Sequence, residues 1–158
     1  MNESHESTVP VIIPGETAKP PSEICGRCLC GRVRYAIQGH WGIFQYCHGS
    51  RCRKVTGSAF AANWLVSPAD FRWLGGEECV GRYALPEAKH FATAFCQHCG
   101  SALPWLAQSG KAVVVPAGSL EEDPAIRPLQ NVFWGSRAAW YVEPNTLLAY
   151  EELPPKRR

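Results

Sequence analysis

Short runs of alternating polar and apolar residues, separated by turn signals, extend over most of this chain. Residues 32–37 read RVRYAI, so successive side chains would point to opposite faces of an extended strand. Further short segments rich in aromatic or β-branched residues occupy 43–46, 59–66, 71–74, 80–85, 90–95 and 111–115. Helical periodicity is weak, with one short helical turn expected near 52–56. The pattern predicts a mainly β fold of mostly antiparallel strands with short helical turns.

The two ends of the chain differ in composition from its middle. Residues 1–22 mix Pro, Ser, Glu and Thr, which predicts a flexible N-terminal tail. Strand-like sequence fills residues 23–142, and we expect one domain there, because a chain of 158 residues can bury a single core without disulfides. Residues 143–158 are expected to form a C-terminal extension.

Composition is that of an ordinary globular protein. Hydrophobic residues make up 46% of the chain and charged residues 19%, and the formal net charge is only +2. This balance gives no reason to expect nucleic acid or an anionic membrane as a partner. No apolar run approaches the roughly 18 residues of a membrane-spanning helix.

Eight cysteines raise the question of disulfides or metal. The first residues lack the basic start, apolar stretch and small-residue cleavage site of a signal peptide, so we expect a cytoplasmic protein. Clustered thiols in such a chain are metal ligands more often than disulfides, because the cytoplasm keeps thiols reduced.

Four of these cysteines lie in two short clusters, each followed by glycine. The clusters are Cys28-Leu29-Cys30-Gly31 and Cys96-Gln97-His98-Cys99-Gly100. Four thiolates from two such turns match the tetrahedral all-sulfur shell of structural zinc. Two alternatives stay open: Cys25 and Cys28 also form a Cys-x-x-Cys turn, and Cys96 with Cys99 could be a redox pair. The redox motif needs a following helix, however, and Gly-Ser-Ala-Leu-Pro is a poor helix start.

A second cluster combines two thiols with basic side chains. Cys47 and Cys52 supply two thiolates, whereas a catalytic zinc commonly has three protein ligands and one open position. The neighbouring Arg51, Arg53 and Lys54 would favour the thiolate forms and could bind carboxylates of a substrate.

Four short motifs follow one another along the chain. They are Gly26-x-Cys28-x-Cys30-Gly31-x-Val33-x-Tyr35, Cys47-His48-x-x-x-Cys52-Arg53-Lys54-x-Thr56-Gly57-Ser58, Phe95-Cys96-x-x-Cys99-Gly100-Ser101 and the weaker Gly135-Ser-Arg-Ala-Ala-Trp140. This ordered set resembles the family of glutathione-dependent formaldehyde-activating enzymes, which shares a domain with centromere protein V. The resemblance covers most of the chain, from about residue 25 to residue 140.

The resemblance implies a fold, a metal content and a reaction. The implied fold is a β-tent of packed antiparallel sheets. Cys28, Cys30, Cys96 and Cys99 fall on the structural zinc ligands of the family, and Cys47 and Cys52 on two of the three cysteines of its catalytic zinc. The implied reaction joins glutathione to formaldehyde and, run backwards, is a carbon–sulfur lyase reaction. A small thiol and an aldehyde are therefore the expected partners, with Arg51, Arg53 and Lys54 on the carboxylates of glutathione.

Position 49 departs from the family pattern. The family has Cys-His-Cys-x-x-Cys, and this chain has Gly49 in place of the middle thiol. In an extended segment Cys47 and position 49 share a face, whereas His48 points away. A third donor would have to be His48, Cys25 or the thiol of the substrate. The departure also favours an alternative function, a non-catalytic zinc-stabilised binding module that has lost the second metal.

Several aromatic residues and one cysteine are assigned structural roles. Cys79 has no partner at metal spacing and is expected to be a small buried hydrophobe. Core or pocket-wall positions are expected for Trp64, Trp73, Trp105, Trp134 and Trp140.

Overall fold

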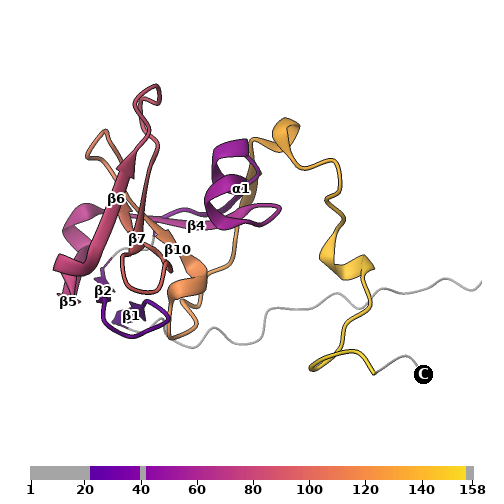
Figure 1. Cartoon of the computed structure of the whole chain (residues 1–158), viewed down its shortest axis with the longest axis horizontal. Helices are drawn as coiled ribbons and strands as arrows, with labels where there is room; N and C mark the ends of the chain where they lie inside the picture. Colours follow the sequence, from indigo (N-terminus) through magenta and orange to yellow (C-terminus); the bar gives the residue numbers. More distant parts are fainter. Residues whose placement is uncertain (1–21, 40–41, 156–158) are drawn as a thin grey trace, which may run out of the picture.

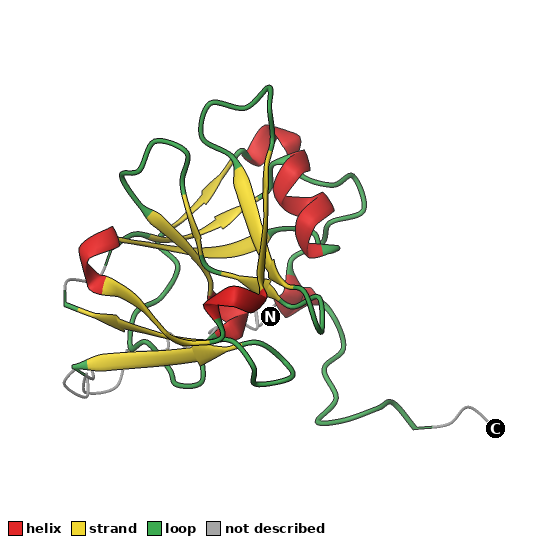
Figure 2. Ribbon diagram, turned by 60° about the vertical axis from the view of Figure 1, so that its left-hand side comes forward, coloured by secondary structure: helices red, strands yellow, loops and turns green. Residues whose placement is uncertain are grey.

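A computed structural model describes residues 22–39 and 42–155 of the chain (Figures 1 and 2). The predicted N-terminal tail lies outside the described residues except for Ser22. The strands are β1 (Glu23–Arg27), β2 (Arg34–Gln38), β3 (Phe44–Cys47), β4 (Ala61–Val66), β5 (Phe71–Gly75), β6 (Val80–Ala84), β7 (Ala92–Cys96), β8 (Ala102–Leu103), β9 (Trp105–Leu106), β10 (Val113–Pro116) and β11 (Gln130–Val132). The helical segments are α1 (Ser50–Thr56) and the 3-10 turns η1 (Pro68–Asp70), η2 (Glu77–Cys79), η3 (Ala117–Ser119), η4 (Trp134–Ser136) and η5 (Pro144–Thr146).

The strands form three sheets that lean toward one another (Figure 2). Their strand orders are β1-β2-β5, β11-β3-β4-β10-β9 and β6-β7-β8. Neighbouring strands are antiparallel, apart from the parallel pair β11–β3. The predicted mainly β fold with short helical turns is therefore confirmed.

The main core lies between the first sheet and the five-stranded sheet. Tyr35 and Ile37 of β2 are fully buried in one cluster with Trp64 of β4 and Val115 of β10. The Tyr35 ring packs edge-on against Trp73, and its hydroxyl hydrogen-bonds the Ser119 side chain at 2.7 Å. Burial of such large side chains is the dominant favourable contribution to folding.

A second buried cluster joins the first sheet to the sheet β6-β7-β8. Val33, Ala94 and Leu103 pack there around the buried thiols of Cys28 and Cys96. Cys79 packs against the same cluster but is only half-buried, so it is more exposed than predicted. This apolar cluster brings two cysteine turns together although they lie far apart in the chain.

Four strands of the structure were not predicted: β1, β8, β9 and β11. β11 shows why, because Gln130-Asn131-Val132 has little strand propensity and becomes a strand only by pairing with Gln45–Cys47. Similarly, Glu23–Arg27 contains a glycine and two charged residues and is held by its register against Arg34–Gln38.

The residues after β11 form an arm that leaves the body of the molecule (Figure 1). Trp140 is 67% exposed on it, so its predicted place in the core or a pocket wall is wrong. The side chain of Trp134 is 39% exposed, and the rest of it packs against the His48 ring. Helices in the described part of the chain are all too short or too polar to cross a membrane.

Candidate metal centre and adjoining pocket

The first cysteine turn connects β1 to β2. The Cys28 N–H donates to the Val33 carbonyl at 3.0 Å, and the Gly31 N–H donates to the Cys28 carbonyl at 2.9 Å. Gly31 has a φ of +75°, a conformation that residues with a Cβ rarely adopt. The turn thereby presents the Cys28 and Cys30 thiols on the same side.

The second cysteine turn connects β7 to β8 and has the same design. The Gly100 N–H donates to the Cys96 carbonyl at 2.8 Å, and Gly100 has a φ of +74°. The Cys96 N–H donates to the Ser101 carbonyl at 2.9 Å. Because β8 follows this turn where a redox Cys-x-x-Cys would need a helix, the redox alternative lacks its structural context.

The two turns bring four sulfurs into one cluster. The Sγ atoms of Cys28, Cys30, Cys96 and Cys99 all lie within 4.8 Å of one another. The Sγ–Sγ distance is 3.5 Å for Cys28–Cys30 and 3.9 Å for Cys30–Cys96. A tetrahedron of sulfurs about 2.3 Å from a central zinc has edges of about 3.8 Å. The cluster therefore fits a metal ion held by four thiolates.

Cys25 does not belong to this cluster. It lies in β1 opposite Ala36, and its N–H donates to a Glu122 carboxylate oxygen at 2.9 Å. The group of thiols close enough to share one ion contains Cys30 and not Cys25. Of the two pairings that the spacing allows, the structure thus forms the Cys28–Cys30 pair.

Hydrogen bonds around the cluster favour the thiolate forms of Cys28 and Cys99. The Arg32 backbone acts to lower the pKa of Cys30, but burial and the hydrogen bonds with the neighbouring thiols raise it to about 11. Ser101 Oγ lies 3.2 Å from the Cys99 sulfur, and this contact is the main reason that the pKa of Cys99 is lowered to about 5. Burial acts to raise the pKa of Cys28, but hydrogen bonds from the Val33 N–H and neighbouring thiols outweigh it and lower the pKa. Metal binding requires deprotonated sulfur, so these contacts support the metal-binding role.

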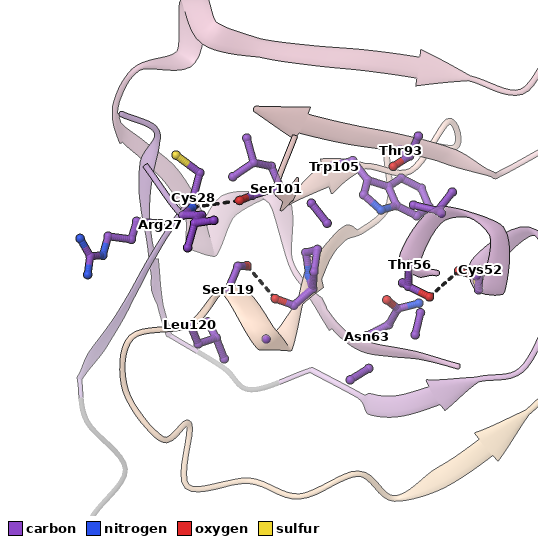
Figure 3. Close-up of a pocket in the computed structure, with 18 of the residues that line it drawn as sticks. Arg27, Cys28, Cys52, Thr56, Asn63, Thr93, Ser101, Trp105, Ser119 and Leu120 are labelled. Carbon is purple, nitrogen blue, oxygen red and sulfur yellow. Dashed lines mark hydrogen bonds between the residues drawn. The ribbon is translucent and has the colours of Figure 1, made fainter. Parts of the chain in front are cut away.

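A pocket of about 630 Å³ adjoins the four-cysteine cluster. Cys28 and Ser101 line one end, and Cys52, Thr56 and Asn63 line the other (Figure 3). Between them lie parts of β4, β7, β8, β9 and the segment 116–121. The pocket thus extends from the four-cysteine cluster to Cys52.

Cys47 and Cys52 form a pair at the start of helix α1. The pKa of Cys47 is lowered to about 6, chiefly because the Cys52 thiol donates a hydrogen bond to its sulfur; burial opposes this, and the Gly49 N–H adds to it. The pKa of Cys52 is raised, because its thiol proton is hydrogen-bonded to the Cys47 sulfur and because the thiol is buried. These opposite shifts favour a state in which Cys47 is the thiolate and Cys52 keeps its proton.

His48 points away from these thiols. Its Nε2 lies 2.9 Å from Asn131 Oδ1, and its ring packs against Phe60, Trp134 and Tyr141. Among residues 22–39 and 42–155, no third His, Cys, Asp or Glu joins Cys47 and Cys52 in a group that could hold an ion. The two thiols thus do not fit a complete three-ligand zinc site, and neither His48 nor Cys25 replaces the missing donor.

The basic residues predicted to bind glutathione lie outside the pocket. Arg51, Arg53 and Lys54 belong to α1, but none of them lines it. The pocket instead contains Arg27, which no sequence motif indicated and whose Nε binds Glu121 Oε2 at 2.8 Å. Trp105 lines the pocket, as its expected role as a wall allows.

Comparison with known proteins agrees with this architecture. A family model described as "Glutathione-dependent formaldehyde-activating enzyme" matches residues 23–136. The crystal structure of a Rhodobacter sphaeroides protein superimposes with a TM-score of 0.52 at 23% sequence identity, covering 68% of this chain and 98% of that chain. This likeness shows a shared fold. No curated protein matches the sequence significantly.

Proposed function

Because this chain belongs to the glutathione-dependent formaldehyde-activating enzyme family, we propose that it is a carbon–sulfur lyase-type enzyme acting on thiol–aldehyde adducts. The thiol is glutathione or a similar small thiol, and S-hydroxymethylglutathione is a representative adduct. One observation carries the proposal: a pocket of ligand size ends on Cys52, whose thiol is paired with the acidic thiol of Cys47.

We propose zinc as the ion of the four-cysteine cluster. Four sulfur donors within 4.8 Å of one another fit structural zinc, which has no open position for a substrate. Its role in this chain is to join the β1–β2 turn to the β7–β8 turn. The pocket wall that contains Cys28 and Ser101 then depends on the ion for its shape.

The Cys47–Cys52 pair is placed to transfer the one proton that the reaction moves. In the addition direction, the proton of the substrate thiol passes to the pair and the sulfur forms a bond to the carbonyl carbon. The C=O π electrons move to oxygen, and the pair returns the proton there. In the reverse direction, the hydroxyl proton passes to the pair, the C–S bond breaks with its electrons on sulfur, and the sulfur takes the proton. A positioned acid–base group of this kind contributes about 10²–10⁴-fold in rate.

Exchange between free and bound aldehyde tests this proposal. We expect the protein to accelerate the interconversion of glutathione plus formaldehyde or hexanal with the corresponding adduct by about a hundredfold or more over the uncatalysed rate. Exchange NMR with ¹³C-labelled aldehyde measures both directions at equilibrium. Uncatalysed rates with both aldehydes would contradict the enzyme proposal.

Gly49→Cys tests whether the second metal site lacks only its third thiol. A Cβ at position 49 would lie 3.6 Å from Cys47 Sγ and 3.7 Å from Phe133 Cγ, which are ordinary contacts. The backbone there, with φ −57° and ψ 144°, suits any residue. We expect zinc content after dialysis to rise from one ion per chain to two, because one thiolate ligand is worth about 3 kcal/mol, or on the order of a hundredfold in affinity.

Gly49→Ser is the matched control for this substitution. Serine adds nearly the same bulk but is a poor zinc ligand, so its zinc content should stay at one ion per chain. Two tightly held ions in the wild type would contradict the expectation and show that another donor completes the site. In the wild type, the described residues supply only two ligands for a second ion.

The missing third ligand also favours the alternative function. A non-catalytic zinc-stabilised module of the same fold would keep the four-cysteine cluster and have no use for Cys47 and Cys52. The exchange experiment separates the two proposals, since a module leaves the rate unchanged.

For either function we propose a cytoplasmic location, where the eight cysteines, all free in the structure, stay reduced. The limits of the single domain, residues 23 and 142, stay a prediction.

A further inference from the structure

The pocket offers no free charged group to a ligand. Apart from Cys28, whose sulfur belongs to the four-cysteine cluster, its charged lining residues are Arg27 and Glu121, and these bind each other at 2.8 Å. The Arg27 side chain also points outward, away from the other lining residues (Figure 3). A carboxylate or ammonium group placed inside the pocket would therefore lose its hydration without gaining an ionic partner, which is costly.

Apolar side chains make up most of the pocket walls. They come from helix α1, from strand β4, and from the β7–β9 region, where the Phe91 and Trp105 rings lie 5.7 Å apart. Further apolar positions are Leu29, Val55, Ala61, Ala62, Leu103 and Leu120. Walls of this kind bind hydrocarbon or aromatic groups by removing apolar surface from water.

The polar lining groups are neutral, and several already have partners within the protein. Thr56 Oγ1 donates to the Cys52 carbonyl at 2.9 Å, and Ser119 Oγ donates to the Pro116 carbonyl at 2.7 Å. Ser101 Oγ accepts the Leu29 N–H at 2.9 Å. These groups shape the pocket, and they leave few polar atoms to orient a ligand between Cys28 and Cys52.

The pocket is also much larger than the aldehyde for which the family is named. Its volume of about 630 Å³ lies in the range of pockets for drug-sized ligands. Formaldehyde has a single carbon and is little larger than water, which takes up about 30 Å³ in the liquid. A one-carbon group at Cys52 would leave most of the apolar wall facing water.

We propose that the pocket binds an apolar group of several carbons, aliphatic or aromatic, on the aldehyde part of the adduct. This inference rests on the proposed function and specifies its substrate class. The carbon that bears sulfur and oxygen lies at Cys52, and the apolar group extends along the wall toward Cys28. The charged ends of a thiol such as glutathione stay outside, on the side of α1 that carries Arg51 and Lys54, both exposed.

Binding of non-reacting adduct analogues tests the proposal directly. S-hexylglutathione and S-methylglutathione differ by five methylenes, each worth about fourfold in affinity when fully buried. We expect calorimetry to show S-hexylglutathione binding at least about tenfold more tightly, since burial at the pocket is incomplete. Equal affinities would overturn the proposal.

Thr93 provides a matched pair of variants inside the pocket. It is half-buried in β7, and Figure 3 shows it beside Trp105. Thr93→Asp places a charge against the apolar wall and should reduce the affinity for S-hexylglutathione by about tenfold or more, with little change for S-methylglutathione. Thr93→Val has nearly the same shape without the charge and should preserve or strengthen the preference. If Thr93→Asp fails to fold, as seen in its melting curve, the comparison of Thr93→Val with the wild type decides.

Turnover separates failure of this inference from failure of the proposed function. A higher kcat/KM for hexanal than for formaldehyde, both with glutathione, supports both proposals. Turnover of formaldehyde at least as efficient as that of hexanal, together with equal binding of the two analogues, overturns the substrate class and leaves the lyase function standing. Absence of turnover with tight S-hexylglutathione binding overturns the lyase function and supports the apolar pocket.

Discussion

Cys99→Ser is expected to release the metal and unfold the domain. Loss of one of four thiolate ligands removes about 3 kcal/mol of metal-binding free energy, and that free energy is also folding free energy. Domains of this size are stable by only about 5–15 kcal/mol. Release of the ion would also weaken the second buried cluster, because Cys28 and Cys96 belong both to that cluster and to the four-sulfur group.

Thermal unfolding followed by circular dichroism, together with zinc content, measures this effect. We expect Cys99→Ser to lose zinc and to show either no cooperative melting transition or one at least about 10 °C below that of the wild type. Cys25→Ser is the matched control, because Cys25 lies outside the four-sulfur group and should change the free energy of unfolding by less than about 1 kcal/mol. A Cys99→Ser variant with wild-type melting and zinc content would show that the cluster does not hold a structural ion.

Cys52→Ser is expected to abolish turnover of a glutathione–aldehyde mixture while the fold stays intact. Serine does not ionise near neutral pH, so the variant loses the acid–base thiol of a residue that lines the pocket. The substitution also removes the main cause of the low pKa of Cys47. We expect the exchange rate to fall by about a hundredfold or more, which is the usual contribution of an acid–base group.

The fold should tolerate this change, because Cys52 lies outside both buried clusters. The melting temperature of Cys52→Ser should therefore stay within a few degrees of the wild-type value, equivalent to about 1 kcal/mol. Ser50→Ala, an exposed position in the same helix, controls for general effects on α1 and should retain activity. Unchanged exchange in Cys52→Ser would remove the Cys47–Cys52 pair from the mechanism and favour the non-catalytic module.

The basic residues of α1 show that closeness in sequence does not predict which side chains line the same pocket. Arg51, Arg53 and Lys54 sit next to Cys52 in the sequence, and this closeness predicted contact with the same ligand. Helix α1 rotates successive side chains by about 100°, so residues adjacent to Cys52 point in other directions. Cys52, Val55 and Thr56 face the pocket, at the three- and four-residue spacing of a helix, and the basic residues do not.

The sequence by itself determined the features that depend on neighbouring residues. Alternation in short segments and frequent turns predicted the mainly β fold, and glycine after each cysteine pair predicted the tight turns at Gly31 and Gly100. Paired thiols at such turns indicated metal ligands, because turn geometry brings the two thiols of each pair close whatever the rest of the chain does. The absence of a thiol at position 49 also predicted an incomplete second site, since strand alternation turns His48 away from Cys47.

Only the tertiary structure decided which distant segments meet. It placed Cys30 in the cluster and Cys25 in a paired strand, a choice that the spacing left open. It also formed the pocket from α1, β4, β7–β9 and residues 116–121, and paired Arg27 with Glu121 at its edge. Contacts of this kind follow from the packing of sheets whose partners are far apart in the chain, and no local pattern of residues records them.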